Sequence, residues 1–191
     1  MLRSFDIFFS FLGLIILSPL FILLCVWIKI DSKGPVLYIQ KRIGKGGFEF
    51  GLFKFRSMHI NADKLGLLTI GGKDPRITKA GYFIRKYKLD ELPQLINVLF
   101  GEMSIVGPRP EVRKYVDLYT EDQKKVLRVR PGITDMASIA YKFENEMLAN
   151  SSEPEKTYIE QIMPDKIRLN MEFIDQPGVI RYFKIIFKTL F

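Results

Sequence analysis

The chain has 191 residues, which suffices for one domain with an appended segment. Its 29 Lys and Arg outnumber its 21 Asp and Glu, and the resulting net charge of +8 suits anionic lipid, phosphate-rich substrates or nucleic acid. A single cysteine, Cys25, excludes a disulfide within the chain, and a single histidine, His59, excludes a multi-histidine zinc site. Any chemistry must therefore depend on carboxylates, hydroxyl groups and cations.

Residues 5–28 form an apolar run in which Asp6 is the only charge. About 20 apolar residues are enough to cross a bilayer as a straight helix. Ser18 and Pro19 lie near the middle of the run, and proline there predicts a bend because it removes a backbone donor and clashes with the preceding turn. The Ser18 hydroxyl can bond a carbonyl group that the bend sets free.

Basic residues flank this run on both sides, with Arg3 before it and Lys29 and Lys33 after it. The positive-inside rule is satisfied at both ends if the segment enters the membrane, turns and leaves on the same side. The sequence leaves two topologies open, a re-entrant hairpin with its break at Ser18 and Pro19, and a kinked single span.

A β-hairpin is predicted next, with strands at 36–44 and 48–58 joined by the glycine-rich turn 44–47. Lys54 and Arg56 alternate with phenylalanines in the second strand, so one face is expected to pack while the other presents two cations. The turn lacks the spacing and the following helix of a phosphate-binding loop, so we favour a plain hairpin turn.

Helical patterns follow a polar loop around 71–75. Helices are predicted at 78–87, 90–100, 121–129 and 154–173. In the second of these, an apolar stripe at helical spacing is predicted to be buried, and its members are Leu89, Leu92, Ile96 and Leu99. Gly101 is the expected C-terminal stop of that helix.

The last segment, 179–191, has the pattern of a basic amphipathic helix. One face is apolar and carries Ile180, Phe183, Phe187 and Leu190, while the other carries Arg181, Lys184 and Lys188. Such a helix suits the bilayer interface, where its cations meet lipid headgroups. Packing on the domain's own core is the alternative, and we favour the membrane because the N-terminal run already places the chain there.

Asp90 and Glu91 stand at the predicted start of the 90–100 helix. The helix dipole favours negative charge there, so Asp90 is expected to stay ionised and to act as a nucleophile or as a ligand of Mg²⁺. An acidic pair at a helix start is also common without any catalytic role. The surroundings decide between these interpretations.

Several cations are expected near this acidic pair. Lys54, Arg56 and Arg85 belong to the neighbouring predicted elements, and Arg109 lies between two prolines that hold its guanidinium in place. Arg130 precedes another rigid Pro-Gly corner. Carboxylates in a cationic cleft indicate a diphosphate substrate whose charge the cations neutralise.

The segment 89–111, LDELPQLINVLFGEMSIVGPRPE, resembles the signature of the small monotopic phosphoglycosyl transferases, which are bacterial sugar transferases. The similarity also includes the Ser18-Pro19 break, the hairpin sequence of 40–58 and VRPGIT at 129–134. It implies an α+β, mostly helical fold with a small β-hairpin and surrounding interfacial helices. The expected organisation is a re-entrant membrane anchor at 1–33, a catalytic domain at 34–178 and a C-terminal amphipathic helix at 179–191.

The resemblance also implies a reaction, in which a sugar-1-phosphate passes from a UDP-sugar to polyprenyl (undecaprenyl) phosphate and UMP is released. Asp90 would be the nucleophile and a Mg²⁺ ligand, and Glu91 would position the metal or the acceptor phosphate. The expected phosphate contacts are Lys54, Arg56, Arg85, Arg109 and Arg130. The implied location is the bacterial inner membrane with the catalytic domain facing the cytoplasm, in contact with membrane lipids and with no nucleic-acid partner. A homo-oligomer is compatible with the sequence.

One segment departs from the commoner form of the family, because 135–138 reads Asp-Met-Ala-Ser where many members have Gly-Trp-Ala-Gln. Loss of the aromatic residue removes a stacking surface for base or sugar, which leaves the donor sugar open. No multi-span region precedes the apolar run, so we expect the minimal catalytic form. Two other functions stay open: a phosphohydrolase acting on a lipid diphosphate with the same carboxylates, and a non-enzymatic basic protein that binds anionic lipid or nucleic acid.

Overall fold

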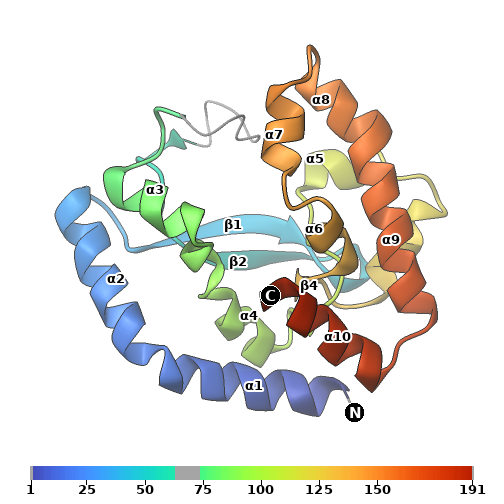
Figure 1. Cartoon of the computed structure of the whole chain (residues 1–191), viewed down its shortest axis with the longest axis horizontal. Helices are drawn as coiled ribbons and strands as arrows, with labels where there is room; N and C mark the ends of the chain where they lie inside the picture. Colours follow the sequence, from blue (N-terminus) through green and yellow to red (C-terminus); the bar gives the residue numbers. More distant parts are fainter. Residues whose placement is uncertain (1, 63–73, 191) are drawn as a thin grey trace.

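A computed structural model describes residues 2–62 and 74–190 and gives a mostly helical chain around a small β-hairpin (Figure 1). Residues 71–73 of the predicted polar loop, residue 191 and the Leu190 side chain lie outside this description. The α-helices are α1 (Leu2–Ile16), α2 (Ser18–Asp31), α3 (Lys79–Lys86), α4 (Gln94–Phe100), α5 (Arg113–Val116), α6 (Met136–Ala140), α7 (Glu144–Ala149), α8 (Pro154–Thr157), α9 (Met163–Asp175) and α10 (Val179–Leu190). The strands are β1 (Leu37–Ile43), β2 (Glu49–Phe55), β3 (Ser104–Val106) and β4 (Gly132–Thr134).

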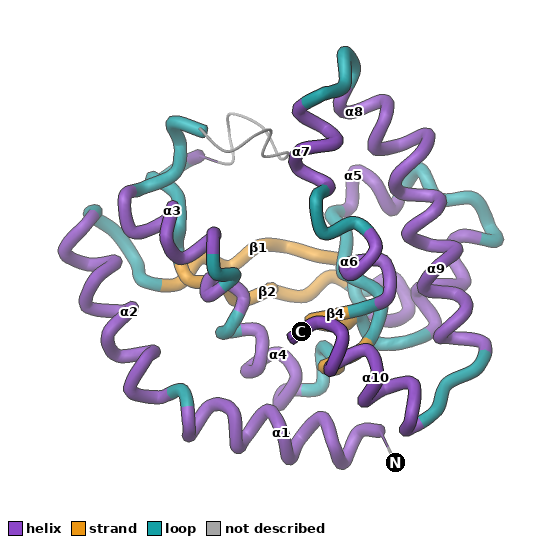
Figure 2. Tube along the Cα trace, in the orientation of Figure 1, coloured by secondary structure: helices purple, strands orange, loops and turns teal. Residues whose placement is uncertain are grey.

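The predicted hairpin is confirmed as the antiparallel pair β1 and β2, which runs through the middle of the molecule with helices on its sides (Figure 2). Its turn is a short 3₁₀ helix, Lys45–Gly47, in which Gly46 and Gly47 have φ angles of 71° and 81°. Glycine is favoured at such left-handed positions because it has no Cβ. The prediction of a hairpin turn at residues 44–47 is therefore confirmed.

A second sheet was not predicted. β3 and β4 are three-residue strands that pair in parallel, with Ser104 opposite Gly132 and Val106 opposite Thr134. Strands this short show no alternation that a sequence pattern can detect. Two glycines let the backbones meet, since a Cβ built on Gly132 would lie 2.1 Å from the nitrogen of Gly107. This sheet brings residues 107–110 next to residues 132–135.

The N-terminal run forms two helices, α1 and α2, bent by 61° at their junction. Among the described residues no single helix has the length and apolar character to cross a membrane, whereas this bent pair meets both criteria together. The Ser18 hydroxyl donates to the carbonyl oxygen of Ile15 at 2.8 Å, so the predicted bend and its hydrogen bond are confirmed. The re-entrant topology stays a prediction.

Polar residues attach α1 to the rest of the molecule. The buried Asp6 carboxylate accepts hydrogen bonds from the Ser104 hydroxyl at 2.9 Å, the Ile105 backbone N–H at 2.9 Å and the Tyr182 hydroxyl at 2.8 Å. Asp6 thus connects α1 to both β3 and α10. Arg3 donates to carbonyl oxygens near the C-terminal end of α4, where a cation is favoured by the helix dipole.

The inner face of α2 contributes to an apolar cluster with β2 and α3. Leu24 and Ile28 are buried there with Phe55, Ala80 and Ile84. The outer faces of α1 and α2 carry exposed large apolar side chains, among them Phe8, Phe11, Ile15, Ile16, Ile22, Leu23, Val26 and Ile30. One face of the helix pair therefore packs on the domain, and the opposite, apolar face is exposed.

The predicted 90–100 helix begins later than expected. Asp90 and Glu91 belong to a 3₁₀ turn, Leu89–Glu91, and the α-helix α4 starts only at Gln94. The predicted buried stripe is also wrong in part: the fully buried side chains are Gln94, Asn97 and Val98, while Leu89, Leu92, Ile96 and Leu99 are partly buried. Burial of Asn97 is possible because its side chain bonds the backbone of Gly51 and Phe53, which hydrophobic periodicity does not register.

The remaining helical predictions have different outcomes. Residues 78–87 contain α3, capped by the Thr78 side chain, which accepts from the Gly81 N–H. Residues 121–129 form a 3₁₀ helix, Gln123–Arg128, instead of an α-helix. The predicted 154–173 helix is confirmed as α8 and α9, joined by a π-helical turn, Tyr158–Ile162.

The C-terminal helix α10 begins at Val179, where it was predicted to begin. Its inner face carries Tyr182 and Ile185, which are buried against Val106. Ile180 and Phe187 on the predicted apolar face are exposed. One stripe of α10 therefore packs on the core, as the alternative had it, while contact of the exposed apolar stripe with a membrane stays a prediction.

Candidate active site

The acidic pair Asp90-Glu91 lies in the connection between α3 and α4, close to the hairpin. Asn97 holds α4 on β2, because its side-chain amide donates to the Gly51 carbonyl at 2.7 Å and its oxygen accepts from the Phe53 N–H at 3.0 Å. This contact places the start of α4 beside Lys54 of β2. The apolar periodicity of the sequence did not predict this contact of Asn97 with β2.

Glu91 is held by two cations. Its carboxylate accepts two hydrogen bonds from the Arg109 guanidinium, with Nη1 at 3.1 Å from Oε2 and Nη2 on Oε1, and the Lys54 ammonium lies 3.6 Å from Oε1. Burial raises the pKa of Glu91, but the charges of Arg109 and Lys54 outweigh it and hold that pKa well below its usual range. Glu91 is therefore a fixed anion.

Asp90 differs from its neighbour. It is buried, with 8% of its surface exposed, yet no hydrogen bond or ion pair engages its carboxylate among residues 2–62 and 74–190. Burial and the charge of Glu91 raise its pKa, while Lys54, Arg85 and Arg109 act in the opposite direction. Since α4 begins at Gln94, the predicted helix-dipole stabilisation of an ionised Asp90 is replaced by this balance of burial and nearby cations.

Lys54 is the cation shared by the pair. Burial lowers the pKa of Lys54, the positive charges of Arg109 and Arg42 act in the same direction and the charge of Glu91 opposes them, and the resulting pKa is about 8. An ammonium group with this pKa is only partly protonated in mildly alkaline solution. The charge of the site therefore changes near pH 8.

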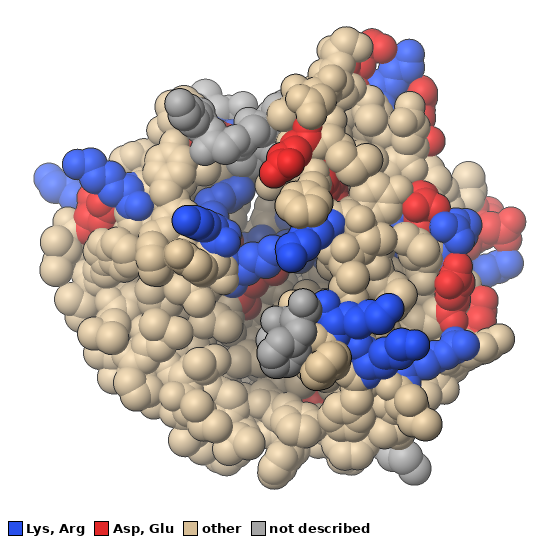
Figure 3. All heavy atoms as spheres, viewed as in Figure 1, with Lys and Arg blue, Asp and Glu red and all other residues tan. Residues whose placement is uncertain are grey.

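Five of the predicted site residues come together. Glu91, Lys54 and Arg109 share the contacts described above, and the charges of Lys54, Arg109 and Arg85, which lies in the last turn of α3, act on Asp90. Figure 3 shows a hollow at the centre of this face with basic side chains along its rim and acidic atoms at depth. The structure thus places a carboxylate with no hydrogen-bonding partner among cations.

Arg56 and Arg130 are placed elsewhere. The guanidinium of Arg56 donates to the carbonyl oxygens of Ser32 at 2.8 Å and of Lys33, just after α2. That of Arg130 donates to the carbonyl of Gly101 at 2.6 Å, at the end of α4. Both follow the preference of cations for helix C-termini, which sequence spacing does not distinguish from phosphate binding. Their phosphate contacts stay a prediction.

The segment 135–138 meets the protein interior. Asp135 and Ala137 are buried, and Met136 packs against the cluster of Val106, Tyr182 and Ile185. Position 136 therefore contributes to the core beneath α10, and the predicted effect of the lost aromatic residue on the donor sugar stays a prediction.

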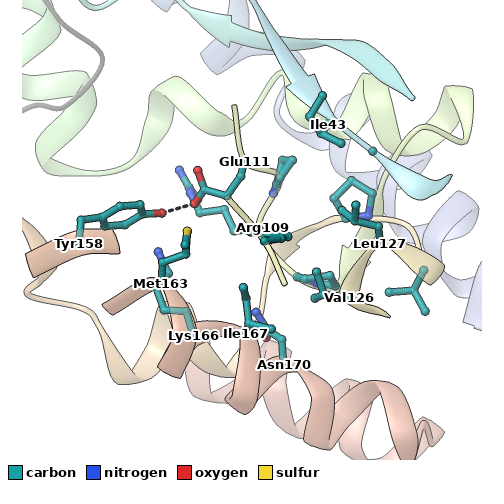
Figure 4. A pocket seen from close by; sticks show the side chains of 16 residues that line it. Ile43, Arg109, Glu111, Val126, Leu127, Tyr158, Met163, Lys166, Ile167 and Asn170 are labelled. Carbon is teal, nitrogen blue, oxygen red and sulfur yellow. Dashed lines mark hydrogen bonds between the residues drawn. The ribbon is translucent and has the colours of Figure 1, made fainter. Parts of the chain in front are cut away.

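A second, small and partly open hollow is lined in part by Arg109 (Figure 4). Ile43, Val126 and Ile167 line it together with Arg109 and Glu111, and the Tyr158 hydroxyl donates to Glu111. Neither Asp90 nor Glu91 lines it. This hollow is therefore separate from the acidic pair, and its apolar lining residues lie beside Arg109.

The side chains near Asp90 suit a magnesium ion that takes most of its ligands from water and substrate. No group of three or more His, Cys, Asp or Glu side chains is placed to hold a metal in the described part of the chain. Mg²⁺ often takes one or two carboxylates and completes its shell with waters and substrate phosphate oxygens. Since Glu91 is committed to Arg109 and Lys54, Asp90 is the carboxylate free to take part in such a shared site.

Comparison with known proteins adds an independent finding. The profile of the family described as "Bacterial sugar transferase" matches residues 1–191. The UDP-N-acetylgalactosamine-undecaprenyl-phosphate N-acetylgalactosaminephosphotransferase of Aeromonas hydrophila is 40% identical over 144 residues, which cover 74% of this chain and 34% of that protein. The undecaprenyl-phosphate glucose phosphotransferase of Komagataeibacter xylinus is 39% identical over 195 residues, covering 98% of this chain and 35% of that protein.

A third relative is the UDP-glucose:undecaprenyl-phosphate glucose-1-phosphate transferase of Escherichia coli (strain K12). It is 35% identical over 193 residues, covering 99% of this chain and 39% of that protein. The chain therefore spans well under half the length of each of these three relatives. All three names include undecaprenyl phosphate; two give glucose as the sugar and one gives N-acetylgalactosamine.

Proposed function

The chain belongs to the bacterial sugar transferase family, and on that premise we propose that it transfers a sugar-1-phosphate from a UDP-sugar to polyprenyl (undecaprenyl) phosphate, releasing UMP. The observation that carries the proposal is the asymmetry of the acidic pair. Glu91 is fixed by Arg109 and Lys54, whereas Asp90 is buried with no hydrogen-bonding partner in the described part of the chain. Relatives named for transfer to undecaprenyl phosphate support the acceptor, and two of the three names include a UDP-sugar.

In the first step a carboxylate oxygen of Asp90 attacks the phosphorus that bears the sugar. The bond from that phosphorus to the bridging oxygen of the diphosphate breaks, and UMP leaves with the electron pair. The product is an aspartyl-phosphosugar intermediate, an acyl phosphate on Asp90. Burial raises the pKa of Asp90, which makes its carboxylate more basic and hence a stronger nucleophile once ionised.

In the second step a phosphate oxygen of the polyprenyl phosphate attacks the same phosphorus. The bond to Asp90 breaks, the carboxylate is regenerated, and the sugar leaves on a polyprenyl diphosphate. Division into two displacements lets one set of cations serve both. Lys54, Arg85 and Arg109 neutralise the charge that develops on the phosphoryl oxygens in each step.

Magnesium is part of the proposal. Asp90 would hold Mg²⁺ jointly with the diphosphate oxygens of the donor, and the ion would neutralise their negative charge and that of the leaving UMP. Glu91 keeps its place between Arg109 and Lys54 and so maintains the position of these cations. Its ion pairs also keep two positive charges beside the reacting phosphate.

We place the site at the cytoplasmic face of the bacterial inner membrane, with α1 and α2 as a re-entrant hairpin. The support is a continuous apolar surface. Aromatic contacts extend it from α2 to α3, through Trp27 and Phe83 at 5.2 Å between ring centroids, and from α1 to α10, through Phe5 and Phe183 at 5.3 Å. A site at the interface can receive a soluble nucleotide sugar and a lipid phosphate together.

Trapping of the intermediate tests the mechanism. The full chain in nanodiscs is incubated with a UDP-sugar and Mg²⁺ but no acceptor, quenched and digested, and peptides are analysed by mass spectrometry. A sugar-phosphate adduct on Asp90 is expected in the wild type and in the matched surface variant Asp117→Asn, and no adduct in Asp90→Asn. An adduct on another residue contradicts the assignment.

The stoichiometry of UMP release separates transfer from hydrolysis. Transfer predicts about one UMP per active site without polyprenyl phosphate, and continuous turnover once it is added. Continuous UMP release without the acceptor would show a phosphohydrolase. Binding to anionic vesicles without any UMP release, graded by salt, would indicate a non-enzymatic lipid-binding protein.

A further inference from the structure

Asp135 is a buried carboxylate between three parts of the chain. It stands in the turn from β4 to α6, with 2% of its surface exposed. It accepts hydrogen bonds from the Arg109 backbone N–H at 2.7 Å, from the Asn170 side-chain amide at 3.2 Å and from the Ser138 N–H at the start of α6. Because it is buried, water cannot replace it as an acceptor.

The contact with Arg109 is special because of the neighbouring prolines. Pro108 and Pro110 have no backbone N–H, so the Arg109 N–H is the only backbone donor of residues 108–110. On the opposite side, the Gly132 N–H donates to the Pro108 carbonyl at 2.9 Å and the Gly107 N–H donates to the Thr134 carbonyl at 3.0 Å. The segment is thus held by β4 on one side and by Asp135 on the other.

Three converging donors require an acceptor without donors of its own. A carboxylate has two oxygens and about four acceptor positions, whereas an asparagine side chain would direct an N–H₂ group at one of the donors. The negative charge also lies near the Arg109 guanidinium, whose pKa is raised first by Glu91 and also by Asp135. Asp135 therefore fits its place by hydrogen bonding and by charge.

We propose that Asp135 is a positioning residue: by holding the Arg109 backbone N–H, it directs the Arg109 guanidinium onto Glu91 and so keeps Asp90 free beside these cations. Its own carboxylate is committed to donors on other parts of the chain. The effect reaches the reaction through Arg109. The kinetic part of this inference rests on the proposed transferase function, and the structural part does not.

The variant Asp135→Ser separates this role from simple helix capping. Serine is about as good an N-cap as aspartate, so α6 keeps its cap through Ser138, while one hydroxyl cannot also hold the Arg109 N–H. Asp135→Asn is the second variant, used if the serine protein melts more than about 10 °C below the wild type. Ser138→Ala is the matched control, since it keeps the Ser138 N–H and its bond to Asp135.

Hydrogen exchange gives a readout independent of activity. In the full chain in nanodiscs, a peptide covering residues 107–110 reports on Arg109, whose amide hydrogen is the only one among residues 108–110. We expect this amide to exchange about tenfold faster in Asp135→Ser than in the wild type or Ser138→Ala, because its acceptor is lost. We also expect kcat to fall about 10–100-fold while KM changes less than about threefold.

Failure of the positioning role and failure of the proposed function give different results. Wild-type kcat in Asp135→Ser, or unchanged exchange at Arg109, would overturn the positioning role and leave Asp135 as a helix cap. Absence of any transferase turnover in the wild type would overturn the proposed function instead, and the exchange result would then decide the positioning role by itself.

Discussion

Two aspartates, Asp6 in the N-terminal helix pair and Asp90 in the cleft, both have buried carboxylates, but of these two only that of Asp6 accepts hydrogen bonds from the described residues. Each is nearly inaccessible, at 3% and 8% exposure. Asp6 accepts hydrogen bonds from three residues and thereby joins α1 to β3 and α10. Asp90 has no hydrogen-bonding partner in the described part of the chain, and burial raises its pKa. A satisfied carboxylate stabilises the fold, whereas an unsatisfied one is available for a ligand or for chemistry.

The largest expected effect is that of Asp90→Asn. Turnover should fall by about 10⁴-fold or more, because the nucleophile is lost. The fold should become more stable at neutral pH. The pKa of Asp90 is raised in the folded state, so stability falls as the pH rises from the ordinary value through the raised one, and an amide has no such cost.

Kinetics and thermal melting at pH 7 and pH 4 check both effects. The Tm of Asp90→Asn should exceed that of the wild type at pH 7, by roughly 2–4 °C for each kcal/mol regained, and the difference should shrink at pH 4. A lower Tm at pH 7 would show that Asp90 is a structural residue like Asp6.

Lys54 should impose an alkaline limit on the reaction. Burial lowers its pKa to about 8, so above that pH the free enzyme loses the charge that faces Glu91 and the substrate. We expect kcat/KM to fall about tenfold per pH unit well above pH 8. In Lys54→Arg the limit should vanish, because a guanidinium stays charged. An unchanged limit in that variant would assign it to another group.

Asp6→Asn tests whether Asp6 stabilises the fold without taking part in the reaction. An amide cannot satisfy all the donors around Asp6, so we expect a loss of about 1–3 kcal/mol in the free energy of unfolding. Turnover per folded molecule should stay within about twofold, since no contact joins Asp6 to Asp90 or Glu91 in the described part of the chain. Asp117→Asn, at an exposed position, is the control for stability. Loss of turnover without loss of stability would contradict this division.

Arg56→Lys should have the smallest effect on kinetics. The guanidinium holds the carbonyls of Ser32 and Lys33, so the expected loss is about 1–2 kcal/mol of stability, with KM for the UDP-sugar changed less than about twofold. A KM raised about tenfold at unchanged Tm would instead establish the phosphate contact predicted from the sequence.

Local patterns predicted several elements well for physical reasons. The β1–β2 hairpin follows from alternating aromatic residues around a glycine-rich turn, and the bend at Ser18 follows from the chemistry of proline. The C-terminal helix α10 starts at the predicted residue because its amphipathic period is regular. The start of α4 was placed too early, since a 3₁₀ turn continues the same periodicity through Asp90 and Glu91.

By itself the sequence determined the apolar N-terminal run and its bend, the hairpin, the acidic pair and the family signature, because each depends on residues close together in the chain. Only the tertiary structure decided which charges act together. It joined Glu91 to Arg109 and Lys54, committed Arg56 and Arg130 to backbone carbonyls, and placed Asp135 under Arg109. These choices depend on contacts between residues 18 to 37 positions apart, and on burial, neither of which local periodicity encodes.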